Sequence, residues 1–189
     1  MIQFIPESLI LAALLLMILP LDWYMSVLIA SLFHEMCHIL SVYLLNGRLL
    51  TIKVRCMGCT IEAAGLGEWR QFLSILAGPL GSFSLLILYR IAPKLAICGF
   101  IQGIFNLLPF LHLDGGRLLR IFLNSCCPKQ ADAIQYIVAI ITCVILDVVA
   151  VVLIRSYGTG LWLIFAAVLW NVRMLPRKIP CKPWEIGVQ

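Results

Sequence analysis

The chain has 189 residues, of which 62% are hydrophobic and 12% are charged. A typical soluble domain has about 25% charged residues, so this composition excludes a soluble globular protein and indicates a protein that crosses a membrane several times. The formal net charge is +5. We interpret the basic residues as determinants of orientation in the membrane and not as a nucleic-acid-binding surface.

Residues 1–22 are predicted to form an N-terminal membrane anchor helix. The apolar run from Leu9 to Leu19 is the centre of this segment, and no Lys or Arg occurs before Arg48. A secretory signal peptide would need a basic n-region and a cleavage site of small residues, and neither is visible. We therefore expect this segment to stay attached as an anchor.

The second apolar run, from Trp23 to Leu45, contains the sequence His34-Glu35-Met36-Cys37-His38. As a helix the run would be about 34 Å long, which is enough to cross a bilayer. Histidines four residues apart project from one face of a helix. The H-E-x-x-H pattern is that of zinc hydrolases, in which two histidines bind Zn²⁺ and the glutamate takes a proton from metal-bound water. A glutamate near the middle of a span costs about 2.5–3.5 kcal/mol, so a purely structural histidine pair is the less favoured interpretation.

The next segment, residues 48–67, is too polar to span a membrane. Its polar and apolar residues alternate loosely, which predicts a β-hairpin or a short sheet. A third span is predicted from Gln71 to Tyr89, and it contains Gly78-Pro79 among other small residues. Small residues allow helices to approach closely in lipid, so this span is expected to pack tightly against a neighbour.

The fourth apolar stretch runs from Leu95 to Leu113 and contains Pro109. Proline lacks a backbone donor and disfavours helix at the preceding residue, so we expect the helix to break there. Asp114 is then expected to act as the N-cap of a new helix from Gly115 to about residue 123. Non-helical backbone at membrane depth is tolerated only where protein or a water-filled cavity surrounds it.

Asp114 is also the best candidate for a third metal ligand. A catalytic zinc ion uses three protein ligands and keeps an open position for water, so the two histidines are one ligand short. Asp114 stands at the head of a helix after an intramembrane break and is followed by two glycines. Asp147, inside the fifth predicted span, is the competitor, although it lies nearer the opposite side of the membrane.

The last two spans are predicted from Ala133 to Ile154 and from Leu161 to Asn171. The predicted fold class is an all-α polytopic membrane protein with about six transmembrane helices and a small β-hairpin between the second and third. After the anchor, we expect a core of residues 23–125 with the H-E-x-x-H helix, the hairpin, the Gly-Pro helix and the broken helix. Residues 126–172 form two further helices, and residues 173–189 a basic cytoplasmic tail.

The basic residues fall unevenly on alternate loops. One side receives only Arg90, Lys94 and Arg155. The other side receives eleven, namely Arg48, Lys53, Arg55, Arg70, Arg117, Arg120, Lys129, Arg173, Arg177, Lys178 and Lys182. The positive-inside rule then puts the hairpin, the Asp114 helix and both termini in the cytoplasm, so the H-E-x-x-H motif is expected to be reached from that side.

These motifs resemble those of the site-2 protease family of intramembrane zinc metalloproteases, of the M50 type. The resemblance rests on His34-Glu35-x-x-His38, on Asn106-x-x-Pro109-x-x-x-x-Asp114-Gly115 and on Gly78-Pro79 between them, and it covers about residues 20–125. With six expected spans and no PDZ module, the chain is most similar to the compact sporulation-type branch, that of stage IV sporulation protein FB.

By this resemblance, His34, His38 and Asp114 bind one Zn²⁺ per chain, and Glu35 activates the water. Asn106 is expected to hold the substrate backbone or the developing oxyanion, with a helix-ending cap as the alternative. The resemblance implies an intramembrane metalloendopeptidase that hydrolyses a peptide bond in or near a transmembrane segment of a membrane-associated substrate, as in regulated intramembrane proteolysis. The expected partners are that substrate, the lipid bilayer and a regulatory membrane protein, in a bacterial cell membrane.

Other interpretations stay open. Cys56 and Cys59 have the spacing of a metal or redox pair and would gain ligands from Cys126 and Cys127, although no second CxxC motif and no nearby histidine supports this. His112 is interpreted as a loop histidine, with a fourth metal ligand as the alternative. From another functional class, a divalent-metal transporter would use the same His and Asp cluster along a translocation path.

Overall fold

The computed structural model describes residues 2–4, 20–55 and 58–157. The helices are α2 (Leu21–Leu44), α3 (Glu68–Ser84), α4 (Pro93–Asn106), α5 (Asp114–Cys126) and α6 (Ala131–Tyr157), with a 3-10 helix η1 (Leu85–Arg90) after α3. The strands are β1 (Ile2–Phe4), β2 (Arg48–Arg55) and β3 (Gly58–Ala64). The predicted sixth span and the basic tail lie outside the described residues.

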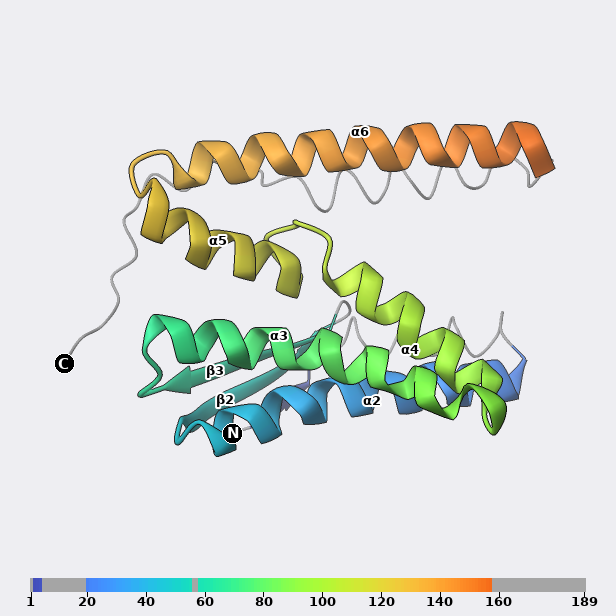
Figure 1. Cartoon of the computed structure of the whole chain (residues 1–189), viewed down its shortest axis with the longest axis horizontal. Helices are drawn as coiled ribbons and strands as arrows, with labels where there is room; N and C mark the ends of the chain where they lie inside the picture. The colour runs from blue at the N-terminus through green and yellow to red at the C-terminus, as the bar shows by residue number, and fades with distance from the viewer. Residues whose placement is uncertain (1, 5–19, 56–57, 158–189) are drawn as a thin grey trace.

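Helices α2, α3 and α4 pack against one another, and α5 lies between α3 and α6 (Figure 1). A buried cluster of Ala30, Leu85 and Cys98 joins α2, η1 and α4 at one end of this group. A second cluster joins Phe110 and Leu113, just before α5, to Ala139 and Cys143 of α6. The chain segment before α5 is therefore held mainly by α6.

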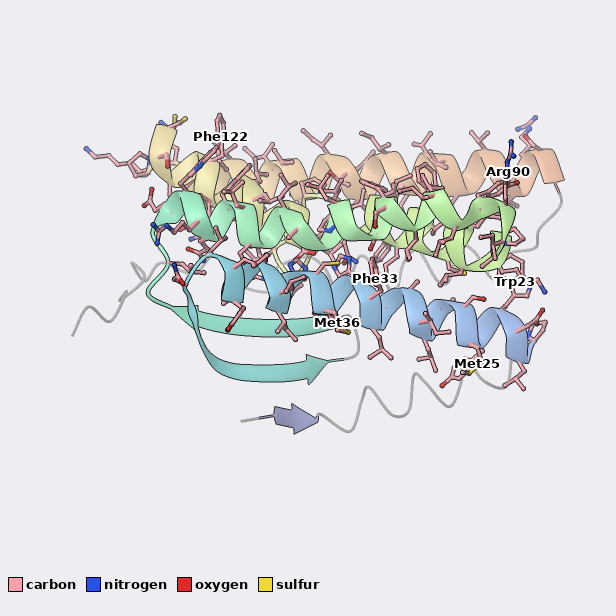
Figure 2. All side chains as sticks on the ribbon, turned by 60° about the horizontal axis from the view of Figure 1, so that its bottom comes forward. Trp23, Met25, Phe33, Met36, Arg90 and Phe122 are labelled. Carbon is pink, nitrogen blue, oxygen red and sulfur yellow. The ribbon has the colours of Figure 1, made fainter. Side chains whose placement is uncertain are left out.

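Three of the described helical segments are long and apolar enough to cross a membrane: Leu21–Leu44, Glu68–Arg90 and Ala131–Ser156. Their outward faces carry exposed apolar side chains, among them Met25, Phe33 and Met36 on α2, which are labelled in Figure 2. Exposed apolar side chains along a helix are what a lipid environment requires. These long apolar helices, with their exposed apolar side chains, identify the chain as a membrane protein.

The predicted fold class, all-α with about six transmembrane helices and a small β-hairpin, is wrong. The described residues contain three candidate spans. The fourth predicted span fails because α4 ends at Asn106 after 14 residues, which is about 21 Å and too short to cross. The first predicted span, from Leu9 to Leu19, and the sixth lie outside the described residues.

The strands also differ from an isolated hairpin. Strands β2 and β3 pair antiparallel between α2 and α3, but β1 adds to β2 in parallel, with Gln3 opposite Lys53. The sheet has three strands in the order β1-β2-β3. Asn46, with φ of 58°, makes the left-handed turn that ends α2 and leads the chain into β2. The N-terminal segment thus begins with a strand that is anchored to the sheet.

The break before α5 occurs where Pro109 predicts it. Residues 107–113 form no helix, and the backbone folds back so closely that a Cβ on Gly115 would lie 2.0 Å from the carbonyl oxygen of Leu107. Glycine is required at that approach, because no side chain fits. Asp114 is the first residue of α5 and not its N-cap, which is Leu113, and the helix continues to Cys126. The Asp114 side chain is consequently available for other contacts.

Candidate metal centre

The two histidines of the H-E-x-x-H motif lie on the buried face of α2. The residues of α2 that are buried recur every fourth position: Ala30, His34, His38 and Val42. His34 is 2% exposed and His38 is 7% exposed. A four-residue repeat follows one face of a helix, and here that face packs against α3.

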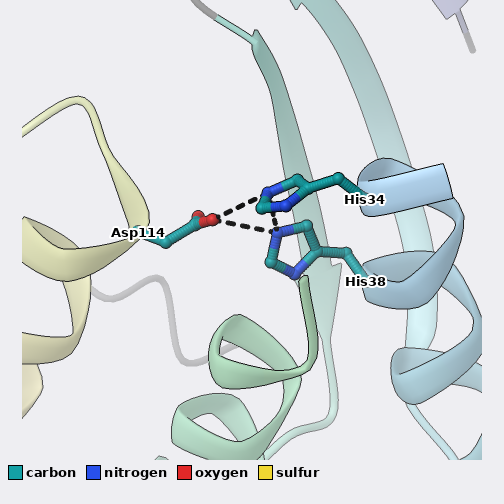
Figure 3. A group of neighbouring side chains, drawn as sticks. All are labelled: His34, His38 and Asp114. Atoms are coloured by element: carbon teal, nitrogen blue, oxygen red, sulfur yellow. Dashed lines mark hydrogen bonds and ion pairs between the residues drawn. The ribbon is translucent and has the colours of Figure 1, made fainter. Parts of the chain in front are cut away.

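Asp114 reaches the same point from α5. Its Oδ2 atom lies 3.1 Å from Nε2 of His34 and 3.1 Å from Nε2 of His38. The two Nε2 atoms are 3.2 Å apart. Figure 3 shows the aspartate facing the edges of both rings. Three potential ligand atoms from two helices therefore converge on one point.

The spacing of these atoms fits a tetrahedral metal ion. Ligands about 2.0–2.1 Å from zinc in tetrahedral geometry stand about 3.3–3.4 Å from one another. The three distances of 3.1, 3.1 and 3.2 Å are close to that value. His34, His38 and Asp114, all buried, form a group that could hold a metal ion.

The outer nitrogen of each ring is also engaged. Nδ1–H of His38 donates to the backbone carbonyl of Ser74, at 2.9 Å. A carbonyl oxygen only accepts, so a proton is on Nδ1, and the ring in its neutral form presents a lone pair at Nε2. Nδ1 of His34 lies 2.8 Å from the hydroxyl oxygen of Ser82, and that contact suits the same tautomer.

A small residue on α3 makes room for His38. A Cβ on Gly78 would lie 2.1 Å from Nε2 of His38. Ser74, Gly78 and Ser82 are all buried and are spaced four residues apart, so they share one face of α3. This face lies directly against the two imidazole rings.

Asp114 is supported from its own helix and from α6. Its Oδ1 atom lies 3.7 Å from the Arg117 guanidinium, one turn along α5. Gln135 of α6, which is buried, donates from Nε2 to the carbonyl of Gly116 at 2.9 Å. Arg120 donates to Oε1 of Gln135 at 3.1 Å. This network joins the first turns of α5 to α6, two residues from the proposed ligand.

The remaining predicted residues take different places. Glu35 is half-buried on α2 and interacts electrostatically with His38. Asn106 is the last residue of α4 and is half-buried. His112 is exposed, and Asp147 lies in α6 and interacts electrostatically with Cys143. Neither belongs to the metal-binding group found among the described residues.

The alternative of a cysteine site stays untested. Cys126 and Cys127 are exposed free thiols at the end of α5. Cys56 lies outside the described residues.

Two residues at the centre were not anticipated from the sequence. Ser74 contacts His38, which lies 36 residues away in the chain, and Ser82 contacts His34, which lies 48 residues away. The one available signal was the spacing of Ser74, Gly78 and Ser82. Such spacing predicts close helix packing, but it says nothing of histidine as the neighbour.

Two protein-family models match this chain. The family model described as peptidase M50B-like matches residues 8–108, which is more than half of the chain, and that of peptidase family M50 matches residues 73–148. No curated protein matches the chain. The sporulation-type branch is tested by neither family model and stays a prediction.

A solved structure shares the fold. The chain is similar to a site-2 protease from Methanocaldococcus jannaschii, with a TM-score of 0.63 and 17% sequence identity. The likeness covers 97% of this chain and 94% of that protein. On the strength of the family models and this shared fold, the chain belongs to peptidase family M50, the family of the site-2 proteases.

Proposed function

We propose that this protein is an intramembrane zinc metalloendopeptidase that cleaves a membrane-associated substrate in or near a transmembrane segment. The observation that carries the proposal is the convergence of two imidazole nitrogens and one carboxylate oxygen within 3.2 Å of one another in a membrane-spanning member of a peptidase family. In this proposal His34, His38 and Asp114 hold one zinc ion per chain.

The donor set suits a catalytic ion. Two histidines and one carboxylate leave one tetrahedral position for water, as in other zinc hydrolases. Bound zinc lowers the pKa of that water toward 7 and polarises the carbonyl of the scissile bond. The residues of the chain must then move a proton and hold the substrate.

Glu35 is proposed as the general base. It follows His34 directly on α2, and its carboxylate is near enough to His38 for an electrostatic interaction. In this role the carboxylate would take a proton from the attacking water and pass it to the leaving amine. Its neighbour His34 would meanwhile keep the ion in place.

Asn106 is proposed to bind the substrate backbone or the developing oxyanion. It ends α4 where the chain turns back toward α5, and the carbonyl of the next residue, Leu107, lies against Gly115 beside Asp114. The side-chain amide is a hydrogen-bond donor suited to negative charge on oxygen. The substrate must be extended at this point, because a helix hides its carbonyls in hydrogen bonds.

The proposed location is a bacterial cell membrane with the site reached from the cytoplasm. Arg90, at the end of η1, and Phe122, in α5, lie toward opposite ends of the helices in Figure 2. Helix α5 also carries the basic residues Arg117 and Arg120. The greater number of basic residues on the α5 side favours the cytoplasm for that side.

The test compares zinc content with cleavage of a model transmembrane substrate in the wild type, Glu35→Gln and Asp114→Asn. We expect one zinc per wild-type chain and cleavage, zinc without cleavage in Glu35→Gln, and loss of both in Asp114→Asn. Cleavage by Glu35→Gln would refute the general base. A wild type that binds zinc, cuts nothing and moves metal across vesicles would instead support the transporter.

A further inference from the structure

We propose that Ser82 is a positioning residue that orients His34 for metal binding. The inference rests on the proposed zinc site and adds a side chain that lies outside the ligand set. Its hydroxyl oxygen is 2.8 Å from Nδ1 of His34, and Ser82 is 0% exposed. Both side chains are buried, and the Ser82 hydroxyl is the hydrogen-bond partner of this ring nitrogen.

The position of Ser82 follows from how α2 and α3 pack. His34 and His38 are one turn apart on α2, while Ser74, Gly78 and Ser82 are spaced by one turn each along α3. Gly78 lets the ring of His38 sit against the backbone of α3. With the helices this close, a side chain as short as serine reaches across to His34.

The two histidines are held in different ways. Nδ1–H of His38 donates to the backbone carbonyl of Ser74, which any residue at that position would supply. The Ser41 hydroxyl also donates to this carbonyl, at 3.3 Å. Nδ1 of His34, by contrast, meets a side-chain hydroxyl. One substitution therefore removes the support of His34 and leaves the support of His38 unchanged.

The hydrogen bond fixes the orientation of the His34 ring, and the Ser82 hydroxyl can accept from Nδ1–H when Nε2 carries the lone pair. With Nδ1–H donating to Ser82, Nε2 of His34 carries the lone pair and faces Oδ2 of Asp114. Without the hydroxyl, the ring loses the hydrogen bond that holds Nε2 toward Asp114, and Nδ1–H loses this acceptor when Nε2 binds a metal. Loss of such a partner of a ligating histidine typically lowers metal affinity about 10- to 100-fold.

The experiment measures zinc affinity by competition with a chromophoric chelator on the full chain in detergent. The variants are Ser82→Ala, Ser82→Thr and Ser84→Ala. Ser84 is the matched control, because it lies half a turn along α3, is exposed, and donates to the Gly81 carbonyl. We expect about a 10- to 100-fold loss of affinity for Ser82→Ala, recovery in Ser82→Thr, which keeps the hydroxyl, and wild-type affinity in Ser84→Ala.

The visible absorption of the cobalt(II)-loaded protein is the second readout. We expect a changed spectrum in Ser82→Ala with an unchanged melting temperature of the metal-free protein, since a merely structural role would lower that temperature. If Ser82→Ala binds zinc within about twofold of the wild type and has the same cobalt spectrum, the positioning role is refuted while the zinc site stands. If the wild type binds no metal, both this role and the proposed function are refuted. The positioning role is also refuted if Ser82→Ala does not fold while Ser82→Thr folds but binds zinc more weakly than the wild type.

Discussion

His38 occupies the space that a side chain on Gly78 would need, since a Cβ there would lie 2.1 Å from the ring nitrogen Nε2. The contact cannot be relieved by a flexible chain end, because the ring is fixed at its other nitrogen by the Ser74 carbonyl. We therefore expect Gly78→Ala to displace the ring and to lower zinc content to less than one tenth of the wild-type value. Metal analysis of the purified protein measures this.

The control for Gly78→Ala is Gly67→Ala, at the N-terminus of the same helix, where an added Cβ meets nothing within 4 Å. It should bind zinc like the wild type. A fully loaded Gly78→Ala chain would show that the ring has room to move and would contradict the prediction.

The polar network between α5 and α6 is expected to hold Asp114 in register with the histidines. Gln135→Leu removes the donor to the Gly116 carbonyl and the acceptor for Arg120, both at a buried site. Loss of a buried hydrogen-bond partner costs about 1–3 kcal/mol, so we expect a lower melting temperature and weaker zinc binding. Thermal unfolding with and without zinc measures both effects.

Two variants of Gln135 separate the effects of its two hydrogen bonds. Gln135→Glu keeps the acceptor for Arg120 and loses the donor to Gly116, so its zinc affinity should fall like that of Gln135→Leu. The exposed Gln130 provides the control, and Gln130→Leu should leave both quantities unchanged. Wild-type zinc affinity in both Gln135 variants would mean that α6 does not position Asp114.

Metal removal should destabilise the fold as well as abolish activity. The proposed ligands come from α2 and α5, and His34 and Asp114 are 80 residues apart in the chain, so a bound ion would cross-link these two segments. Free zinc at about 100 times its dissociation constant stabilises the folded state by about 2.7 kcal/mol. We expect a chelator to lower the melting temperature of the wild type and to leave that of Asp114→Asn unchanged, as differential scanning fluorimetry would show.

Two residues outside the proposed ligand set, one histidine and one aspartate, provide a test of that set. His112→Ala and Asp147→Asn should each retain one zinc per chain, since neither residue belongs to the ligand group among the described residues. Asp114→Asn should retain none. Zinc loss in Asp147→Asn together with retention in Asp114→Asn would move the third ligand to α6.

The residues of the candidate site were predictable because their chemistry is local. The spacing of His34 and His38 needs only a helix, and Pro109 stops α4 wherever that helix packs. Asp114 follows from the break, and its side chain joins the histidines. The supporting residues could not be found in this way, because Ser82 is defined by a contact across two helices.

The predicted number of membrane spans was wrong because hydropathy does not show where a helix ends. Hydropathy counts apolar residues, and the stretch from Leu95 to Leu113 is mostly apolar, but only the part up to Asn106 is helical. The third strand was missed because the parallel pairing of β1 with β2 joins residues about 50 positions apart, as in Ile2 with Ile52. Pairings of this length leave no periodic signal in a single sequence.

The positions of the proposed ligands in the sequence also determine at which stage of protein synthesis the site can form. A ribosome delivers His34 and His38 to the membrane 80 and 76 residues before Asp114. Until α5 has been synthesised, the nascent chain has the two histidines but lacks the Asp114 carboxylate, the third proposed ligand. With the proposed ligand set, a half-made copy would be unable to cut neighbouring proteins, and hydrolytic competence would arrive only after the helices that surround the histidines are in place.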